Sequence, residues 1–248
     1  MEDKAILADK ETKRTTGKSQ NEGNLENEEG NIFWVKIDGE KKLATLNLVP
    51  GNQVYKEKLV KISDEEFRAW DPFRSKLGAA IMNNLGMLPI VRKSRVLYLG
   101  VSTGTTASHV SDIVGPSGIV FCVEHTSRVA REFLDRVASY RANIVPILQD
   151  ARNPKEYFSV YGGVDVVYVD IAQPDQTEIA ILNCKTYLKK DGYMMLVIKT
   201  RSIDVTKDPS EITRNEARKL KDNFEIVQEL NLEPYEKDHS MIVAKYLG

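Results

Sequence analysis

Acidic and basic side chains follow two apolar segments in the second half of the chain. The segment VDVVYVDIAQPDQ ends its apolar run at Asp170, and VIKT ends a later run at Lys199. Ligands of open α/β sheets gather at the carboxyl ends of the strands. If both segments are neighbouring parallel strands, a carboxylate and an ammonium group face one crevice. Such a pair can orient a substrate hydroxyl group and assist the removal of its proton.

Two more residues could join this pair. Lys76 lies in FRSKLGAAI, within a predicted helix ahead of the sheet, and His239 begins the last predicted strand in EKDHSMIVAKY. A desolvated Lys76 could act as a base. A solvated helix lysine and a hairpin cap are the alternative interpretations of Lys76 and His239. We expect His109 at a helix surface, without a catalytic role.

The segment RVLYLGVSTGTTASHV predicts a strand, a bend and a helix. Gly100 and Gly104 flank the bend, where the backbone can turn sharply and approach a ligand closely. Thr105 or Thr106 is expected to cap the helix. The G-x-x-x-G spacing differs from the dinucleotide-binding fingerprint, and the Lys-Ser/Thr pair of a phosphate loop is missing. A plain tight turn is the alternative interpretation.

Two acidic residues strengthen the interpretation of the bend as a ligand site. Glu124 ends the next predicted strand, where an acid can accept hydrogen bonds from ribose hydroxyls. Asp150 follows the third strand, where it could bind an adenine amino group beside the backbone of Ala151. The combination suits S-adenosylmethionine, which has no pyrophosphate. A solvated carboxylate remains the alternative for Glu124 alone, and the missing third glycine disfavours a nicotinamide dehydrogenase.

The elements that position these residues indicate a doubly wound α/β domain with seven strands. Several apolar runs are continuous, as in a parallel sheet covered on both faces, and helical segments separate them. The predicted strands span residues 96–99, 119–124, 144–148, 164–170, 193–199, 225–232 and 240–246. The predicted helices span residues 105–114, 127–140, 175–188 and 209–222.

The chain divides into three predicted parts. Residues 1–30 are polar and are expected to form a disordered tail. Residues 31–62 form a small antiparallel β module, with a hairpin turn at Asp38-Gly39. Residues 63–248 are expected to form the Rossmann-like domain with its leading helices.

Two leading helices are predicted ahead of the sheet. Ser63 and Glu66 have the spacing of a capping box, which predicts a helix that starts there. A second helix is predicted from near Pro72 to Asn84.

Composition limits the class of protein. The 248 residues are 42% hydrophobic and 29% charged, with a formal net charge of −1, and no apolar run reaches the roughly 18 residues of a membrane span. Cys122 and Cys184 have no CxxC spacing and no clustered histidines, so we predict buried free thiols and no metal site. The near-neutral charge argues against tight binding of free RNA. RNA affinity would come from local patches or from partners.

Longer motifs resemble those of the fibrillarin family. The motifs WDPFRSKLGAAI, YLGVSTGTTASHVSDIVG, VDVVYVDIAQPDQT, LVIKTRSID and LEPYEKDHSMIV carry the resemblance, which covers roughly residues 32–248. Fibrillarins are S-adenosylmethionine-dependent RNA 2′-O-methyltransferases of box C/D ribonucleoprotein particles. The resemblance implies a catalytic group of Lys76, Asp170, Lys199 and His239. It also implies which residues contact the cofactor, at the glycine bend and at the later strand ends. These residues are Gly100, Thr105, Thr106, Glu124, His125, Asp150, Ala151, Asp170 and Gln173.

The resemblance also implies partners. A box C/D guide RNA pairs with the target rRNA or tRNA, a Nop-domain scaffold protein recruits the methyltransferase, and a kink-turn-binding ribosomal-type protein completes the particle. We expect the scaffold to contact the small β module and the adjacent helices. The chain lacks the glycine-arginine-rich segment of eukaryotic fibrillarins, so it resembles the archaeal form and is expected in the cytoplasm, away from membranes.

Two other functions remain open from the sequence. One is methylation of a protein side chain such as glutamine, which would use the same cofactor site. The other is a non-catalytic assembly subunit that keeps only the fold. The presence of Lys76, Asp170 and Lys199 together argues against the second.

Overall fold

The computed structural model describes residues 26–28 and 31–248. The predicted disordered tail over residues 1–30 therefore lies largely outside the described residues, and within it Glu26–Glu28 forms strand β1. No helix in the described part of the chain is long and apolar enough to cross a membrane.

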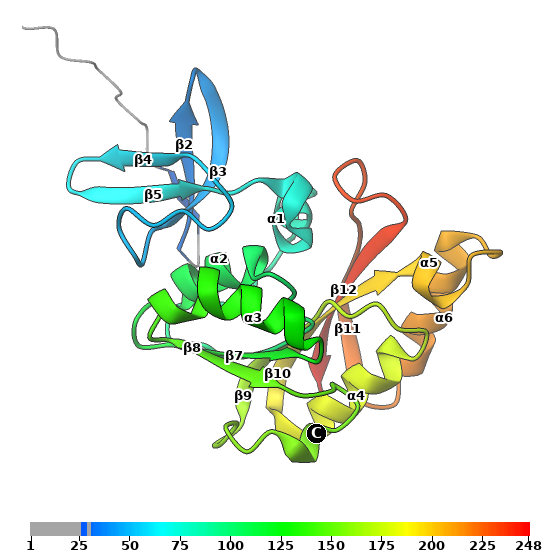
Figure 1. The fold of residues 1–248 in the computed structure, drawn as a ribbon. Helices are drawn as coiled ribbons and strands as arrows, with labels where there is room; N and C mark the ends of the chain where they lie inside the picture. The colour runs from blue at the N-terminus through cyan, green and yellow to red at the C-terminus, as the bar shows by residue number, and fades with distance from the viewer. Residues whose placement is uncertain (1–25, 29–30) are drawn as a thin grey trace, which may run out of the picture.

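A seven-stranded sheet forms the centre of the molecule (Figure 1). Its strands are β6 (Arg95–Leu99), β7 (Ile119–Glu124), β8 (Ile144–Leu148), β9 (Val164–Val169), β10 (Leu188–Lys199), β11 (Phe224–Asn231) and β12 (His239–Tyr246). They lie in the order β11-β12-β10-β9-β6-β7-β8. This confirms the predicted doubly wound fold. The last strand differs from its neighbours, because β12 pairs antiparallel with both β10 and β11.

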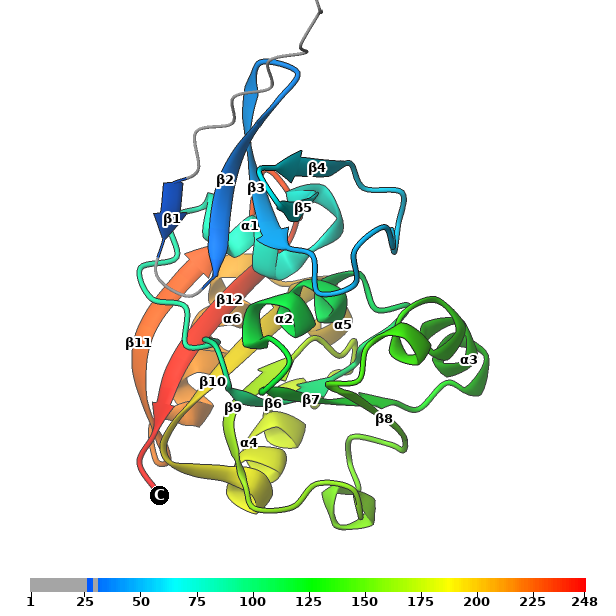
Figure 2. The same ribbon diagram turned by 90° about the vertical axis from the view of Figure 1, so that its left-hand side faces the viewer.

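Helices cover both faces of this sheet (Figure 2). They are α1 (Lys76–Met82), α2 (Thr105–Val114), α3 (Ser127–Arg136), α4 (Gln176–Tyr187), α5 (Thr200–Ile203) and α6 (Pro209–Leu220), with short 3₁₀ turns at Pro72–Arg74, Ala138–Tyr140 and Pro154–Glu156. Side chains of α1, α2 and α3 share one core with the sheet, and those of α4 and α6 share the other. The helix predicted over residues 127–140 is thus α3 followed by a 3₁₀ turn.

The small N-terminal sheet has the strand order β1-β2-β3-β5-β4. Its remaining strands are β2 (Ile32–Ile37), β3 (Glu40–Leu46), β4 (Leu59–Ile62) and β5 (Glu65–Ala69). The Asp38-Gly39 turn between β2 and β3 is confirmed, and both residues have the positive φ angles, 52° and 85°, that such a turn requires.

The predicted helix cap at Ser63 is wrong. Ser63 lies in the turn between β4 and β5, with φ of 54°, and β5 pairs with both β3 and β4. The small sheet therefore continues to Ala69, beyond residue 62. Residues 65–69 form a strand because their side chains alternate between two buried surroundings. Phe67 is buried in the core of the small sheet, whereas its neighbour Arg68 is buried toward α2.

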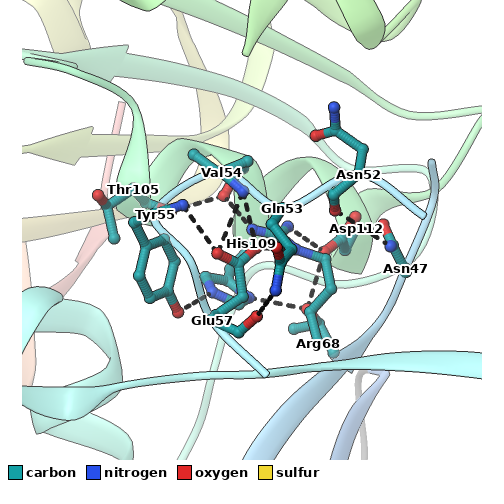
Figure 3. Close-up of polar contacts among 12 residues, drawn as sticks. Asn47, Asn52, Gln53, Val54, Tyr55, Glu57, Arg68, Thr105, His109 and Asp112 are labelled. Atoms are coloured by element: carbon teal, nitrogen blue, oxygen red, sulfur yellow. Dashed lines mark hydrogen bonds and ion pairs between the residues drawn. The ribbon is translucent and has the colours of Figure 1, made fainter. Parts of the chain in front are cut away.

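Buried charges join the small sheet to α2 (Figure 3). The Arg68 guanidinium lies 2.7 Å from carboxylate oxygens of both Glu57 and Asp112. Arg141 contacts the other oxygen of Asp112 at 2.6 Å. The side chains of all four residues are at most 1% exposed. Two positive and two negative groups thus neutralise each other in the interior.

His109 belongs to the same network, which overturns the prediction of a helix-surface histidine. Its side chain is fully buried, with Nδ1 2.8 Å from the Thr45 hydroxyl and Nε2 2.7 Å from the Tyr55 hydroxyl. The ring stacks on Trp70 at a centroid distance of 4.5 Å. Burial, together with the charges of Arg68 and Arg141, places the pKa of His109 well below its usual 6.5.

Replacement of Arg68 by leucine should destabilise the protein strongly. The change leaves the Glu57 and Asp112 carboxylates with an uncompensated buried charge, a situation that costs about 3–5 kcal/mol. Urea unfolding measures the loss. Arg131→Leu is the matched control, because Arg131 is exposed on α3. A loss below about 1 kcal/mol for Arg68→Leu would contradict this account.

The buried His109 should also make stability depend on pH. In the unfolded chain His109 takes up a proton near pH 6.5, whereas the folded chain keeps it neutral. Because the pKa of His109 is lower in the folded protein, its neutral ring stabilises the fold at pH values above the pKa of the unfolded chain. This stabilisation is lost as the pH falls. The free energy of unfolding should drop by about 1.4 kcal/mol per pH unit below that value. Urea unfolding at pH values from 7 to 5 gives the free energy of unfolding as a function of pH. The slope of this dependence should be shallower for His109→Gln than for the unmodified protein, and equal slopes would refute the assignment.

Candidate functional site

Asp170 lies directly after β9 and is the centre of a charged cluster. Lys199, the last residue of β10, places Nζ 2.8 Å from Asp170 Oδ1 and 2.8 Å from the Asp170 backbone oxygen. Lys76 Nζ lies 3.4 Å from both carboxylate oxygens. The three side chains are only 12–18% exposed. The predicted meeting of a carboxylate and an ammonium group at neighbouring strand ends is therefore what the structure contains, and Lys76 joins them from a helix.

Lys76 reaches this cluster because of the way its helix begins. It is the first residue of α1, whose N-cap Ser75 accepts a hydrogen bond from the Gly78 backbone at 3.2 Å. The Thr106 hydroxyl, at the start of α2, donates to the same Ser75 oxygen at 2.9 Å. This link fixes the first turn of α1 beside the first turn of α2.

Glu236 is a fourth charged residue of the cluster, and the sequence analysis missed it. Its carboxylate lies 3.8 Å from Lys76 Nζ and 4.0 Å from Nδ1 of His239. It lies in the loop between β11 and β12, where the sequence gives no periodic signal. Glu236 thus lies between Lys76 and His239.

His239 lies beside the cluster without bonding to Asp170. It pairs in register with Lys199 across β10 and β12. Its Nδ1 is 2.6 Å from the backbone oxygen of Lys237, so in the neutral ring we assign the proton to Nδ1 and leave Nε2 as an acceptor. His239 borders a separate groove next to α6.

A cavity of about 220 Å³ opens at the carboxyl ends of β6, β7, β8 and β9. Its lining includes most of the residues predicted to bind a cofactor, namely Gly100, Glu124, His125, Asp150, Ala151, Asp170 and Gln173. Lys199 borders it as well. One cavity therefore touches both the predicted cofactor residues and the charged cluster.

Backbone donors hold the Glu124 carboxylate in place at the end of β7. It accepts hydrogen bonds from the backbone of Ser102 at 3.2 Å and of Thr126 at 2.9 Å. Glu124 is 9% exposed, whereas its neighbour His125 has a side chain 61% exposed. Each carboxylate oxygen accepts more than one hydrogen bond, so Glu124 can also accept from two adjacent hydroxyl groups.

Thr105 and Thr106 do not line the cavity. The helix cap predicted for one of them is wrong, because the N-cap of α2 is Gly104, with φ of 91° and no side-chain cap bond. Thr105 is the first residue of the helix, and Thr106 is 7% exposed and turned toward Ser75.

Arg152 is a second residue that the sequence analysis missed. It donates to Gln173 at 2.9 Å and to Asp175 at 2.8 and 3.1 Å, and it lies 3.7 Å from Asp150. Two of these partners, Asp150 and Gln173, border the cavity. Arg152 thereby connects the loop after β8 to the loop after β9 at the mouth of the cavity.

Gly100 permits the close approach that the bend requires. Its φ is +79°, and a Cβ atom there would lie 2.7 Å from the Asp170 carbonyl oxygen and 2.9 Å from Ile171 Cγ2. A side chain would therefore displace the residues that carry the carboxylate cluster and would fill the edge of the cavity.

Two buried tyrosines lie behind the cluster in the sheet. Tyr98 on β6 and Tyr168 on β9 are in register, with ring centroids 4.6 Å apart. Burial raises the pKa of both hydroxyl groups, and the negative charge of Asp170 adds to this effect. Both rings therefore stay neutral and add no competing charge.

The cavity can bind a nucleoside through backbone and carboxylate acceptors. A hydroxyl group close to that nucleoside can then reach Asp170 and the two lysines. Within residues 31–248, no group of three or more His, Cys, Asp or Glu side chains could hold a metal ion. Group transfer to an oxygen atom is the chemistry that these groups fit.

Comparison with known proteins identifies the family. The fibrillarin family model matches residues 24–248. The chain belongs to the fibrillarin family. The fibrillarin-like rRNA/tRNA 2′-O-methyltransferase of Sulfurisphaera tokodaii is 54% identical over 220 residues, covering 88% of this chain and 94% of the relative.

Solved fibrillarin structures have the same fold. The crystal structure of Aeropyrum pernix fibrillarin with natively bound S-adenosyl-L-methionine superposes with a TM-score of 0.83 at 44% identity, covering 90% of this chain and 97% of that one. The fibrillarin of a fibrillarin/Nop5p complex superposes with a TM-score of 0.79 at 35% identity, covering 90% and 100%.

Replacement of Gly100 by alanine should weaken the binding of S-adenosylmethionine by at least tenfold, which is about 1.4 kcal/mol, because the new Cβ forces the bend and the Asp170 backbone apart. Isothermal titration measures the affinity. Gly39→Ala is the matched control, since Gly39 has a similar φ of +85° but nothing within 4 Å of its Cβ position. Unchanged affinity in Gly100→Ala would show that the bend does not border the ligand.

Proposed function

We propose that this fibrillarin methylates ribose 2′-hydroxyl groups of rRNA and tRNA with S-adenosylmethionine as the methyl donor. The observation that carries the proposal is the shared position of Asp170, which borders the cofactor cavity and holds the ammonium groups of Lys76 and Lys199. A hydroxyl group that reaches Asp170 is thereby next to the donor site. The activity named for the Sulfurisphaera relative supports the same conclusion.

The residues of the cavity fit S-adenosylmethionine. Glu124 would hold the ribose hydroxyls of the cofactor, Asp150 the adenine amino group beside the Ala151 backbone, and Gln173 the rim. Gly100 leaves room at the bend. When bound, the cofactor supplies a methyl group already activated by its sulfonium charge. The bound cofactor of the Aeropyrum structure supports this use of the cavity.

The charged cluster then positions and deprotonates the target hydroxyl. Lys199 and Lys76, as ion-paired ammonium groups, are donors only, and each can orient the hydroxyl oxygen. The Asp170 carboxylate is the acceptor among them, so it would take the hydroxyl proton as the oxygen–methyl bond forms and the methyl–sulfur bond of the donor breaks. This assigns the proton to Asp170 instead of to the lysine base considered from the sequence. His239, which pairs in register with Lys199 and lies 4.0 Å from Glu236, would complete the catalytic group.

The target is selected by a particle and not by this chain alone. The Nop5p partner in the related complex supports binding to a Nop-domain scaffold protein. A box C/D guide RNA would pair with the target, and a kink-turn-binding ribosomal-type protein would complete the particle. The net charge of −1 fits an enzyme that relies on partners for RNA affinity. We place this assembly in the cytoplasm.

Loss of any member of the cluster should stop turnover without unfolding the protein. Lys76→Ala, Asp170→Asn and Lys199→Ala should each lower kcat by at least about a hundredfold, in line with the loss of acid–base and orienting groups. The assay follows radiolabelled methyl transfer to guided RNA in a reconstituted particle, with the methylated ribose mapped by position.

The same sheet offers a matched control. Lys189 and Asp165 form a 2.7 Å ion pair at the opposite end of β9 and β10. Lys189→Ala and Asp165→Asn should leave turnover near that of the unmodified protein. Full activity of Asp170→Asn would remove this carboxylate from the mechanism, and labelled protein in place of labelled RNA would favour the protein-methylating alternative.

A further inference from the structure

The loop between β11 and β12 carries a charged residue, Glu236, that takes no part in the proposed proton transfer. Its carboxylate lies 3.8 Å from Lys76 Nζ and 4.0 Å from Nδ1 of His239. The side chain of Glu236 is 23% exposed and that of Lys76 is 18% exposed, so the two charges meet in partly buried surroundings. Ion pairs between fully exposed side chains contribute little, whereas burial strengthens the attraction between charges. Glu236 can therefore influence where the Lys76 ammonium group lies.

Lys76 is held between two carboxylates that come from different elements. Asp170, directly after β9, lies 3.4 Å from Lys76 Nζ, and Glu236 lies 3.8 Å from the same atom. Both distances exceed the roughly 2.7–2.9 Å of a strong charge-assisted hydrogen bond. An ammonium group has three N–H donors and no acceptor. Lys76 can therefore attract both carboxylates and still point a donor at a substrate oxygen.

An acceptor oxygen of Asp170 is left open by this arrangement. Asp170 Oδ1 is buried and accepts no hydrogen bond from the described residues, although Lys199 Nζ forms an ion pair with it at 2.8 Å. Without Glu236, the ammonium group of Lys76 would be drawn to Asp170 alone. It would then compete with the substrate hydroxyl for the carboxylate that takes the hydroxyl proton. Two lysines and two carboxylates also balance in charge, so the loss of one carboxylate leaves an excess positive charge among these four groups.

Uncharged contacts hold the same loop against α1 (Figure 1). Phe73, in the 3₁₀ turn before α1, meets Tyr235 edge-to-face with ring centroids 5.0 Å apart. At the other end of the helix, the side chain of Asn83 donates to the backbone oxygens of Asn231 and Glu233, both at 2.8 Å. The end of β11 and its loop thus contact both ends of α1, which holds the carboxylate of the loop beside the lysine of the helix.

We propose that Glu236 is a positioning residue for methyl transfer, which acts by holding the Lys76 ammonium group between its own carboxylate and that of Asp170. In this position Lys76 orients the target hydroxyl, and an oxygen of Asp170 stays free for the hydroxyl proton. Glu236 acts through the lysine, because it contacts Lys76 and does not line the cofactor cavity. The inference rests on the proposed function and adds how the lysine is kept in place.

The first test removes the charge of Glu236 and keeps the size of its side chain. In the reconstituted particle, Glu236→Gln should lower kcat by at least about tenfold, because a misplaced orienting group slows the reaction even when every catalytic group is present. KM for the guided RNA and the affinity for S-adenosylmethionine should stay unchanged. Glu233→Gln is the matched control in the same loop, because its exposed carboxylate lies 3.5 Å from the Asp238 backbone nitrogen. Unchanged kcat in Glu236→Gln would overturn the proposal.

A double-mutant cycle identifies the residue through which Glu236 acts. Single-turnover rates with the particle in excess are measured, because the variants are slow. In a Lys76→Met background, Glu236→Gln should cause no further loss of rate, since the group that it positions is missing. In a His239→Asn background the tenfold loss should remain. An equal loss with and without Lys76, or a loss that disappears only without His239, would contradict the proposal.

A conservative variant separates positioning from a merely structural role. Glu236→Asp keeps the charge and should recover part of the rate that Glu236→Gln loses, whereas equal rates in the two variants would show that the charge is not what matters. Thermal unfolding of each variant measures any loss of stability. Absence of methyl transfer by the unmodified particle would refute the proposed function, whereas transfer that is insensitive to Glu236→Gln would refute only the role of Glu236.

Discussion

The carboxylate of Asp112 is the buried charge on which the arrangement of the molecule depends. Its two oxygens meet Arg141 and Arg68, at 2.6 and 2.7 Å, and they also accept from the Leu48 backbone and the Thr45 hydroxyl. A charge buried to this depth is tolerated only when it is paired and its hydrogen bonds are filled. Asp112 lies on α2, so this saturation attaches the small sheet to the helix that begins at the glycine bend. This attachment therefore also fixes where Lys76 of α1 lies relative to the cofactor cavity.

Much of the fold and of the site could be predicted because it depends on local patterns. Continuous apolar runs identified the strands of the large sheet, and the rule that ligands gather at strand carboxyl ends brought Asp170 and Lys199 together. The acid at the end of β7 and the bend at Gly100 were found for the same reason, and both border one cavity. These features need only strand direction and order, which the periodicity of the sequence carries.

Features that depend on contacts between distant segments could not be predicted. Ser63 and Glu66 have the spacing of a helix cap, yet the pairing of β5 with β3 and β4 outweighs that local preference. His109 resembles a surface residue until Tyr55 and Trp70, from the segments next to the strands of the small sheet, cover it. Arg152 and Glu236 lie in loops, where no period marks which side chain turns toward the site.

The position of β12 has a consequence for the order in which the molecule can be completed. The final strand in the chain lies between β10 and β11 and not at the rim of the sheet. Until it is inserted, β10 has an unpaired edge and β11 has no partner in the sheet, so the interior remains open on that side. Contacts between such distant parts of a chain form late and close the structure cooperatively. A growing polypeptide therefore completes its methyl-transfer site only after β12 has been made and inserted between β10 and β11.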